Sequence, residues 1–324
     1  MIASRTPLRV SFFGGGTDFR EYYKEDYGCV LSTAIDQYIY LMVNKKFDGT
    51  IHLNYRKTEI VSNVNEIEHP TIREALKLMN ISNAIEISAV ADVPSHGTGL
   101  GSSSSFIVSV LHALHHYKGN SILSGQLAEE ACHIEIEKLG EPIGKQDQYI
   151  SAYGGFKLIK FNRDETVQIL PVRANRETID ELKSRLLFFY TGVGRKASDI
   201  LTEQRNNIKT KRDTLHKMRS IAETTFSDLN HNRFEDFGDM LHESWMLKRS
   251  LARNVSNSVI DSYYEKARNA GALGGKLLGA GGGGFFMFYC EKEKQPAVTR
   301  ALSDLRQVHF DFENDGSKII YTDR

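Results

Sequence analysis

A glycine- and serine-rich segment at residues 94–106 constrains the fold more than any other part of the chain. It reads Pro-Ser-His-Gly-Thr-Gly-Leu-Gly-Ser-Ser-Ser-Ser-Phe and continues into an apolar stretch at 107–114. The glycines allow a tight turn with inward N–H groups, and the serines begin a helix with free N–H donors and a partial positive charge. Such a helix start binds an anion, most simply a nucleotide's phosphates. The alternative is a flexible linker, but a linker does not begin an apolar helix.

Two further glycine-rich segments lie near the ends of the chain. Residues 8–13 predict a short strand, and Gly14-Gly15-Gly16-Thr17-Asp18 follows it. This segment is either a tight hairpin with Asp18 as a turn residue, or a carboxylate placed to accept hydrogen bonds from sugar hydroxyls. Residues 274–284 contain seven glycines in eleven positions. Because glycine in regular structure costs about 1 kcal/mol relative to alanine, this segment indicates a place where the backbone approaches another group closely.

The composition indicates a globular protein with two domains. A chain of 324 residues is long for one hydrophobic core, and we expect domains at 1–172 and 173–324. The 41 basic and 41 acidic residues give zero formal net charge, which argues against nucleic acid as a partner. No uncharged apolar run reaches the length of about 18 residues that a membrane span needs.

The cysteines and the N-terminal residues favour a cytoplasmic protein. Cys29, Cys132 and Cys290 are widely spaced, which fits a reducing compartment and gives neither a zinc-ligand spacing nor a disulfide framework. The first residues lack the apolar core of a signal peptide. The sequence leaves the oligomeric state open.

Local patterns predict an α+β protein. We expect strands at 8–13, 30–35, 39–44, 50–54, 85–90, 186–190, 285–290 and 318–321, and a strand pair between 154 and 172. We expect helices at 71–79, 102–117, 124–139, 259–270 and 295–307, a long helical region at 197–252, and a glycine-rich turn at 271–284.

The three glycine-rich segments, in this order, resemble the motifs of the GHMP kinase superfamily, which is named for galactokinase, homoserine kinase, mevalonate kinase and phosphomevalonate kinase. The matching residues are roughly 5–18, 94–105 and 275–284, so the resemblance spans the chain. The resemblance implies an N-terminal domain similar to ribosomal protein S5 domain 2 and a C-terminal ferredoxin-like α+β domain. The segment at 14–18 looks most like that of bacterial D-glycero-D-manno-heptose 7-phosphate kinases, with L-fucokinase-like enzymes next.

The resemblance also implies ATP and Mg²⁺ as cofactors and assigns candidate residues. Asp147 matches the aspartate that meets the acceptor hydroxyl, and Arg9 matches a catalytic-site arginine. Ser103 and Glu135 are the candidate magnesium ligands. The candidates for nucleotide binding are Pro94, Gly97, Gly99, Leu100, Gly101, Ser102, Ser103, Ser104 and Ser105. The candidates for substrate binding are Gly15, Gly16, Thr17, Asp18, Gly281 and Gly282.

Simpler roles remain open for several of these residues. Arg9 can form a structural salt bridge, and Asp147 can cap a helix; if Asp147 is catalytic, it either removes the proton or only orients the hydroxyl. Arg195, Lys196 and the charged stretch at 203–219 are either solvated or supply cations for a sugar phosphate.

The resemblance implies phosphorylation of the anomeric C1 hydroxyl of D-glycero-D-manno-heptose 7-phosphate, giving the 1,7-bisphosphate for nucleotide-activated heptose and surface polysaccharide. The rivals are a kinase of L-fucose or another free sugar, and a non-catalytic sugar or nucleotide sensor of the same fold.

Overall fold

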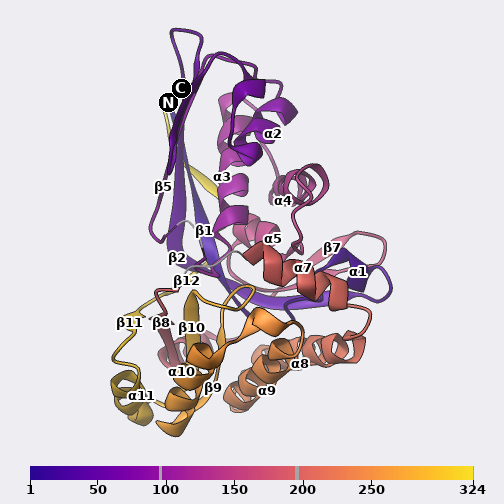
Figure 1. Ribbon diagram of the computed structural model, residues 1–324, viewed down its shortest axis with the longest axis vertical. Helices are drawn as coiled ribbons and strands as arrows, with labels where there is room; N and C mark the ends of the chain where they lie inside the picture. Colours follow the sequence, from indigo (N-terminus) through magenta and orange to yellow (C-terminus); the bar gives the residue numbers. More distant parts are fainter. Residues whose placement is uncertain (95–96, 194–196, 324) are drawn as a thin grey trace.

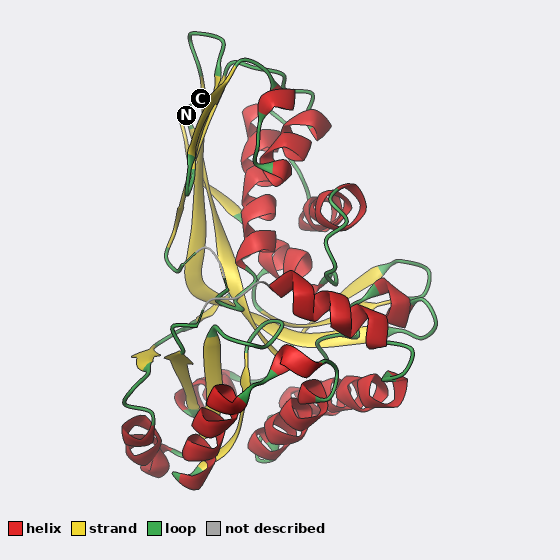
Figure 2. Cartoon of the chain, in the orientation of Figure 1, coloured by secondary structure: helices red, strands yellow, loops and turns green. Residues whose placement is uncertain are grey.

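The protein folds around two β-sheets, as the computed structural model shows (Figures 1 and 2). The structure describes residues 1–94, 97–193 and 197–323. The strands are β1 (Ile2–Phe13), β2 (Gly28–Lys45), β3 (Ile51–Asn54), β4 (Thr58–Val61), β5 (Ile85–Ala91), β6 (Phe156–Phe161), β7 (Val167–Pro171), β8 (Leu186–Tyr190), β9 (Ala272–Leu277), β10 (Phe285–Cys290), β11 (Arg306–Val308), β12 (Phe312–Glu313) and β13 (Lys318–Thr322).

The helices divide between the two sheets. They are α1 (Arg20–Tyr23), α2 (Pro70–Leu78), α3 (Ser102–Tyr117), α4 (Ser124–Cys132), α5 (Gln146–Tyr153), α6 (Arg176–Ser184), α7 (Ala197–Asn207), α8 (Arg212–Asn230), α9 (Phe237–Arg249), α10 (Ser258–Asn269) and α11 (Gln295–Ala301). Short 3₁₀ turns occupy Val64–Glu66, Arg253–Val255 and Lys292–Lys294, and a π-helix occupies His133–Lys138. Helices α2, α3, α4 and α5 cover one face of the larger sheet, whereas α9, α10 and α11 accompany the smaller one (Figure 1). No helix of the described residues is long and apolar enough to cross a bilayer.

The larger sheet is built on two long strands. Among the described residues it has nine strands, with the main path β13-β1-β2-β5-β3-β4, and β6 and β12 also pair with β2. We expected two strands at 30–35 and 39–44, but the chain forms the single strand β2. The register with β1 shifts between Pro7 and Leu8, which pair with Tyr38 and Ile35. A bulge at residues 36 and 37 therefore replaces the expected break.

The smaller sheet corrects two expectations in the second half of the chain. Its four described strands are antiparallel, in the order β11-β8-β10-β9. The expected turn at 271–284 begins as β9, whose Gly275 packs directly against β10: a Cβ on Gly275 would lie 2.3 Å from Cδ1 of Phe288. The helix expected at 295–307 ends at Ala301, and the chain then pairs with β8 as β11.

Two of the helical regions predicted from the sequence each contain more than one helix. The region 197–252 contains α7, α8 and α9 rather than one helical run. The helix expected at 124–139 ends as α4 at Cys132 and continues as the π-helix.

The end of the chain returns to the larger sheet. Strand β13 pairs with β1, and β12 pairs with β2. The division at residues 172 and 173 stays a prediction, and it would leave these two strands in the sheet of the first half.

Candidate active site

The three glycine-rich segments meet at the end of β1. The N–H of Arg9 donates to the carbonyl of Leu100 at 3.0 Å, and the N–H of Phe285 donates to the carbonyl of Thr98 at 3.1 Å. A Cβ on Gly99 would lie 2.3 Å from the Leu278 carbonyl oxygen, and a Cβ on Gly279 would lie 2.4 Å from Cα of Gly99. Gly279 of the third segment is therefore in close contact with the serine-rich loop, and so is Gly284, whose Cβ would lie 2.4 Å from the Thr98 carbonyl oxygen.

Arg9 and Asp147 form a bidentate ion pair at this junction. Nε and Nη2 of Arg9 each donate to one Asp147 oxygen at 2.7 Å. The Arg9 side chain is 5% exposed and that of Asp147 is 22% exposed. Asp147 lies in the first turn of α5, so the start of this helix positions the carboxylate that pairs with Arg9. Each carboxylate oxygen keeps a lone pair for a further donor.

Glu135 lies beside the start of α3. It accepts hydrogen bonds from the hydroxyls of Ser103 at 2.9 Å and Ser104 at 2.7 Å, and from the amide of Gln148 at 2.5 Å. Burial raises the pKa of Glu135 to about 7, although these three hydrogen bonds act in the opposite direction. The π-helix that carries it is a rare element, frequent at functional sites.

A cavity of about 440 Å³ opens over the serine-rich loop. Of the residues predicted to bind nucleotide, those that line it are Gly97, Gly99, Gly101, Ser102, Ser103 and Ser104. The other three lie elsewhere: Pro94 is exposed, Leu100 is buried, and the Ser105 hydroxyl donates to the carbonyl of Pro7. Arg9, Glu135 and Asp147 also line this cavity, together with residues of α7 that the sequence reasoning missed, Ala197, Ser198 and Leu201.

The oxygen atoms at this cavity fit a magnesium–nucleotide complex. Mg²⁺ in kinases is held by one or two protein oxygens together with phosphate oxygens. Glu135 and Ser103 supply such oxygens beside the N–H groups at the start of α3. No cluster of three or more His, Cys, Asp or Glu side chains that could hold a metal is found in the described part of the chain. A site completed by phosphate oxygens is consistent with that finding.

A second cavity, of about 90 Å³, adjoins the first, and Arg9 and Asp147 line both. Gly15, Gly16 and Asp18 line it, as predicted for substrate binding. The Asp18 carboxylate accepts from the N–H of Gly16 at 2.9 Å and from the N–H of Gln146 at 3.3 Å. Burial raises the pKa of Asp18, and the nearby Asp147 adds to the shift.

Three other residues predicted to contact substrate pack elsewhere. The Thr17 hydroxyl donates to the Gly14 carbonyl at 2.8 Å. The N–H of Gly282 donates to the Val255 carbonyl at 2.8 Å, and a Cβ on Gly281 would lie 2.5 Å from the same oxygen. These residues therefore shape the loops.

Two buried lysines line the second cavity, and the sequence alone did not single them out. Lys276 donates to the carbonyls of Ser11 and Phe12, both at 2.9 Å, and Lys248 donates to the Leu277 carbonyl at 3.2 Å. Burial, together with the charge of the neighbouring Arg9, lowers the pKa of Lys276 to about 7. Lys276 stands inside the third glycine-rich segment, so the motif itself was a signal for it.

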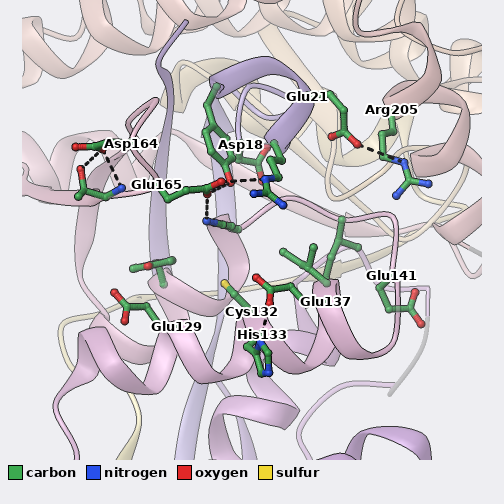
Figure 3. Close-up of a pocket in the computed structure, with 17 residues that line it drawn as sticks. Asp18, Glu21, Glu129, Cys132, His133, Glu137, Glu141, Asp164, Glu165 and Arg205 are labelled. Carbon is green, nitrogen blue, oxygen red and sulfur yellow. Dashed lines mark hydrogen bonds and ion pairs between the residues drawn. The ribbon is translucent and has the colours of Figure 1, made fainter. Parts of the chain in front are cut away.

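A third cavity, of about 620 Å³, is also lined by Asp18 (Figure 3). Carboxylates outnumber the cations that line it, which are Arg20, Lys145 and Arg205. Glu165 accepts from Lys145 and from the Tyr23 hydroxyl, at 2.7 and 2.6 Å. Burial raises the pKa of Glu165, but hydrogen bonds from Lys145, Tyr23 and Lys24 outweigh it and lower the pKa to about 2.

The basic residues considered for a sugar phosphate are mostly paired or undescribed. Arg205 lies 3.9 Å from Glu21, and Arg212 pairs with Glu25. Arg195 and Lys196 lie outside the described residues. Lys209 is exposed and Lys211 is half-buried, so these two stay candidates for binding a sugar phosphate.

Comparisons with known proteins agree with the arrangement of the site. Residues 70–155 match the family model "GHMP kinases N terminal domain", and residues 225–306 match "GHMP kinases C terminal". The chain is 29% identical to the D-glycero-alpha-D-manno-heptose 7-phosphate kinase of Campylobacter jejuni, over 98% of each chain. It is 26% identical to the bifunctional fucokinase/GDP-fucose pyrophosphorylase of Arabidopsis thaliana, covering 95% of this chain and 31% of that protein.

A solved structure resembles the whole molecule. The crystal structure described as a D-glycero-D-manno-heptose 1-phosphate kinase from Bacteroides thetaiotaomicron superposes with a TM-score of 0.83 and 26% sequence identity. The match covers 99% of this chain and all of that one, both sheets included.

Proposed function

This chain belongs to the GHMP kinase family, as its three motifs predicted, and we propose that it is an ATP-dependent sugar kinase that acts on D-glycero-D-manno-heptose 7-phosphate. The proposed reaction transfers the γ-phosphoryl group to the anomeric C1 hydroxyl, and gives the 1,7-bisphosphate and ADP. The observation that carries this proposal is the Arg9–Asp147 pair, which lines both the serine-loop cavity and the Asp18 cavity. A phosphoryl donor in one cavity and a sugar in the other would meet there.

The chain's own residues supply positioning and charge for this transfer. The N–H groups at the start of α3 would hold the phosphates, with the partial positive charge of the helix behind them. Mg²⁺, held by Glu135 and Ser103, would neutralise phosphate charge. Arg9 fixes the Asp147 carboxylate, so that a free lone pair of Asp147 would accept the hydrogen bond of the C1 hydroxyl. The C1 oxygen bonds to the γ-phosphorus as the bond to ADP breaks, and the hydroxyl proton leaves toward Asp147.

The choice of substrate is supported by the relatives. The C. jejuni protein, which is similar along the whole length, is named for a heptose 7-phosphate, whereas the B. thetaiotaomicron structure is described by a heptose 1-phosphate. We propose C1 as the acceptor because an anomeric hydroxyl is more acidic than an ordinary alcohol and so needs less help from Asp147.

An ADP-release assay across a sugar panel tests the proposal. The panel contains D-glycero-D-manno-heptose 7-phosphate, the corresponding 1-phosphate, L-fucose, galactose and mannose. We expect turnover of the 7-phosphate, and a ³¹P spectrum of the product with one anomeric and one primary phosphate. Turnover of an unphosphorylated sugar alone would favour the fucokinase-like alternative. ATP binding without turnover of any sugar would indicate a sensor.

A further inference from the structure

Two polar side chains at the second cavity lack partners, although their polar atoms are buried. The Ser11 hydroxyl oxygen and the Gln146 side-chain amide oxygen have no hydrogen-bond partner among the described residues. Ser11 is 6% exposed, and both residues line the cavity that holds Gly15 and Asp18. A buried polar atom without a partner costs stability. The fold therefore retains two groups here that it does not itself use.

The Ser11 hydroxyl and the amide group of Gln146 border the same space, and the amide nitrogen is the Gln146 atom nearest to it. A Cβ built on Gly15 would lie 3.8 Å from Nε2 of Gln146 and 3.9 Å from the Ser11 hydroxyl oxygen. The space over Gly15 is therefore bordered by a hydroxyl from β1 and an amide from α5. Together they offer donors and acceptors to one small polar group.

Their neighbours place that group next to the reacting one. Ser11 follows Arg9 by two residues on β1, so both side chains lie on the same face of the strand. Gln146 immediately precedes Asp147 in the first turn of α5. A group held by Ser11 and Gln146 is thus the immediate neighbour of a hydroxyl held by Asp147. On a sugar that reacts at C1, the only vicinal hydroxyl is the one at C2.

We propose that Ser11 and Gln146 bind the C2 hydroxyl of the sugar and read its configuration. This inference rests on the proposed function, because it takes C1 as the acceptor. It adds two specificity-determining residues to the site, and it gives Gly15 a role: the missing side chain leaves room for the hydroxyl.

A substrate–variant cycle tests the proposal. Ser11→Ala and Gln146→Met are each assayed with the heptose 7-phosphate and with its 2-deoxy form. We expect each variant to lose about tenfold or more in kcat/KM for the natural sugar, the loss of one buried hydrogen bond. The same variants should differ little from the wild type on the 2-deoxy sugar. Equal losses on both sugars would overturn the proposal.

Thermal stability separates this role from a structural one. Ser32 pairs directly with Ser11 across β1 and β2, is also buried, and donates its hydroxyl to the Val10 carbonyl at 2.9 Å. We expect Ser32→Ala to lower Tm and leave kcat/KM unchanged. Ser11→Ala should leave Tm unchanged or raise it while kcat/KM falls, because no internal hydrogen bond is lost. A fall in Tm for Ser11→Ala without a kinetic effect would contradict the proposal.

Gly15→Ala gives an independent steric probe. The added methyl would make only ordinary contacts with the protein, and it would occupy the space assigned to the hydroxyl. We expect a large rise in the sugar KM, no change in the ATP KM, and partial recovery with the 2-deoxy sugar. Failure of the wild type to use the heptose phosphate would refute the proposed function instead. The cycle is then run with the sugar that the panel identifies and its 2-deoxy form, and equal losses on that pair overturn this inference.

Discussion

Glu135 is a buried carboxylate whose charge changes near neutral pH, because burial raises its pKa to about 7 from the ordinary value of 4.5. Its protonated form adds to folding stability below about pH 4.5, and this contribution is lost as the pH rises through 7. If Glu135 binds Mg²⁺, the cation offsets the buried charge at high pH. We therefore expect Mg²⁺ with ATP to raise Tm more at pH 8 than at pH 6, as measured by thermal unfolding.

The control for this prediction is Glu135→Gln, which keeps the side-chain shape and removes the titration. The variant should show no pH dependence in the Mg²⁺ effect and should lose most of the gain at pH 8. If Mg²⁺ with ATP raised the Tm of the wild type equally at both pH values, Glu135 would not be a ligand of the metal.

Asp147→Asn tests the proposed contact with the acceptor hydroxyl. The amide keeps the size of the side chain but cannot accept the proton, so we expect kcat to fall about a hundredfold to ten-thousandfold while ATP affinity is retained. Arg9→Lys should give a smaller fall, because lysine keeps the charge and loses the bidentate geometry. Steady-state kinetics and ATP titration measure both. If Asp147→Asn were nearly as active as the wild type, the Arg9–Asp147 pair would have only a structural role.

The sequence located some of these residues and missed others for a physical reason. Arg9 and Asp147 are 138 positions apart, and only the motif resemblance joined them. Ser103 and Glu135 were joined in the same way. Ser11 and Gln146 carry no signal in a single sequence, since a serine in a strand and a glutamine at a helix start are ordinary. Their importance lies in the partners they lack, which only packing reveals.

At the level of elements, the glycine content of a segment predicted that its backbone approaches another group closely, but it did not predict which group. Residues 97–101 lead into α3, and the strand expected at 285–290 is β10. The partner of the third glycine segment is the serine-rich loop, a contact between residues about 180 positions apart that local patterns do not encode. Strand β9 was not predicted for the same reason. Its glycines lower the strand propensity of the segment, and the strand forms because it pairs with β10.

Gly99→Ala and Gly49→Ala separate these two uses of glycine. Both residues have a left-handed φ, +77° and +78°. A Cβ on Gly49 meets nothing within 4 Å, so its substitution should cost only the backbone strain of about 1–2 kcal/mol. A Cβ on Gly99 would lie 2.3 Å from the Leu278 carbonyl oxygen and would push the two loops apart. We expect a larger fall in Tm and a raised ATP KM for Gly99→Ala alone; similar values for both variants would contradict a tight loop contact.

On the scale of the whole molecule, one hydrophobic cluster joins the two sheets. Leu8, Val10 and Phe12 of β1 belong to the same buried cluster as Met287 and Tyr289 of β10. The predicted α+β class and GHMP kinase fold are confirmed by the match along the whole chain. The shared core was not predictable, because the sequence pattern marks which residues are apolar and not which distant element each one meets.

Phe237 tests whether the two halves unfold together. Its ring lies 5.5 Å from that of Phe12, 5.1 Å from Phe13 and 5.5 Å from Tyr289, so it bridges α9, β1 and β10. We expect the wild type to show one calorimetric transition. Phe237→Ala should destabilise by about 3–5 kcal/mol and split the transition in two, because it opens a cavity between the halves. Phe288 belongs to a hydrophobic cluster that is confined to the second half of the chain. Phe288→Ala should therefore also lower Tm, but without a comparable effect on the first half. Two transitions in the wild type would instead mean that the halves are independent domains.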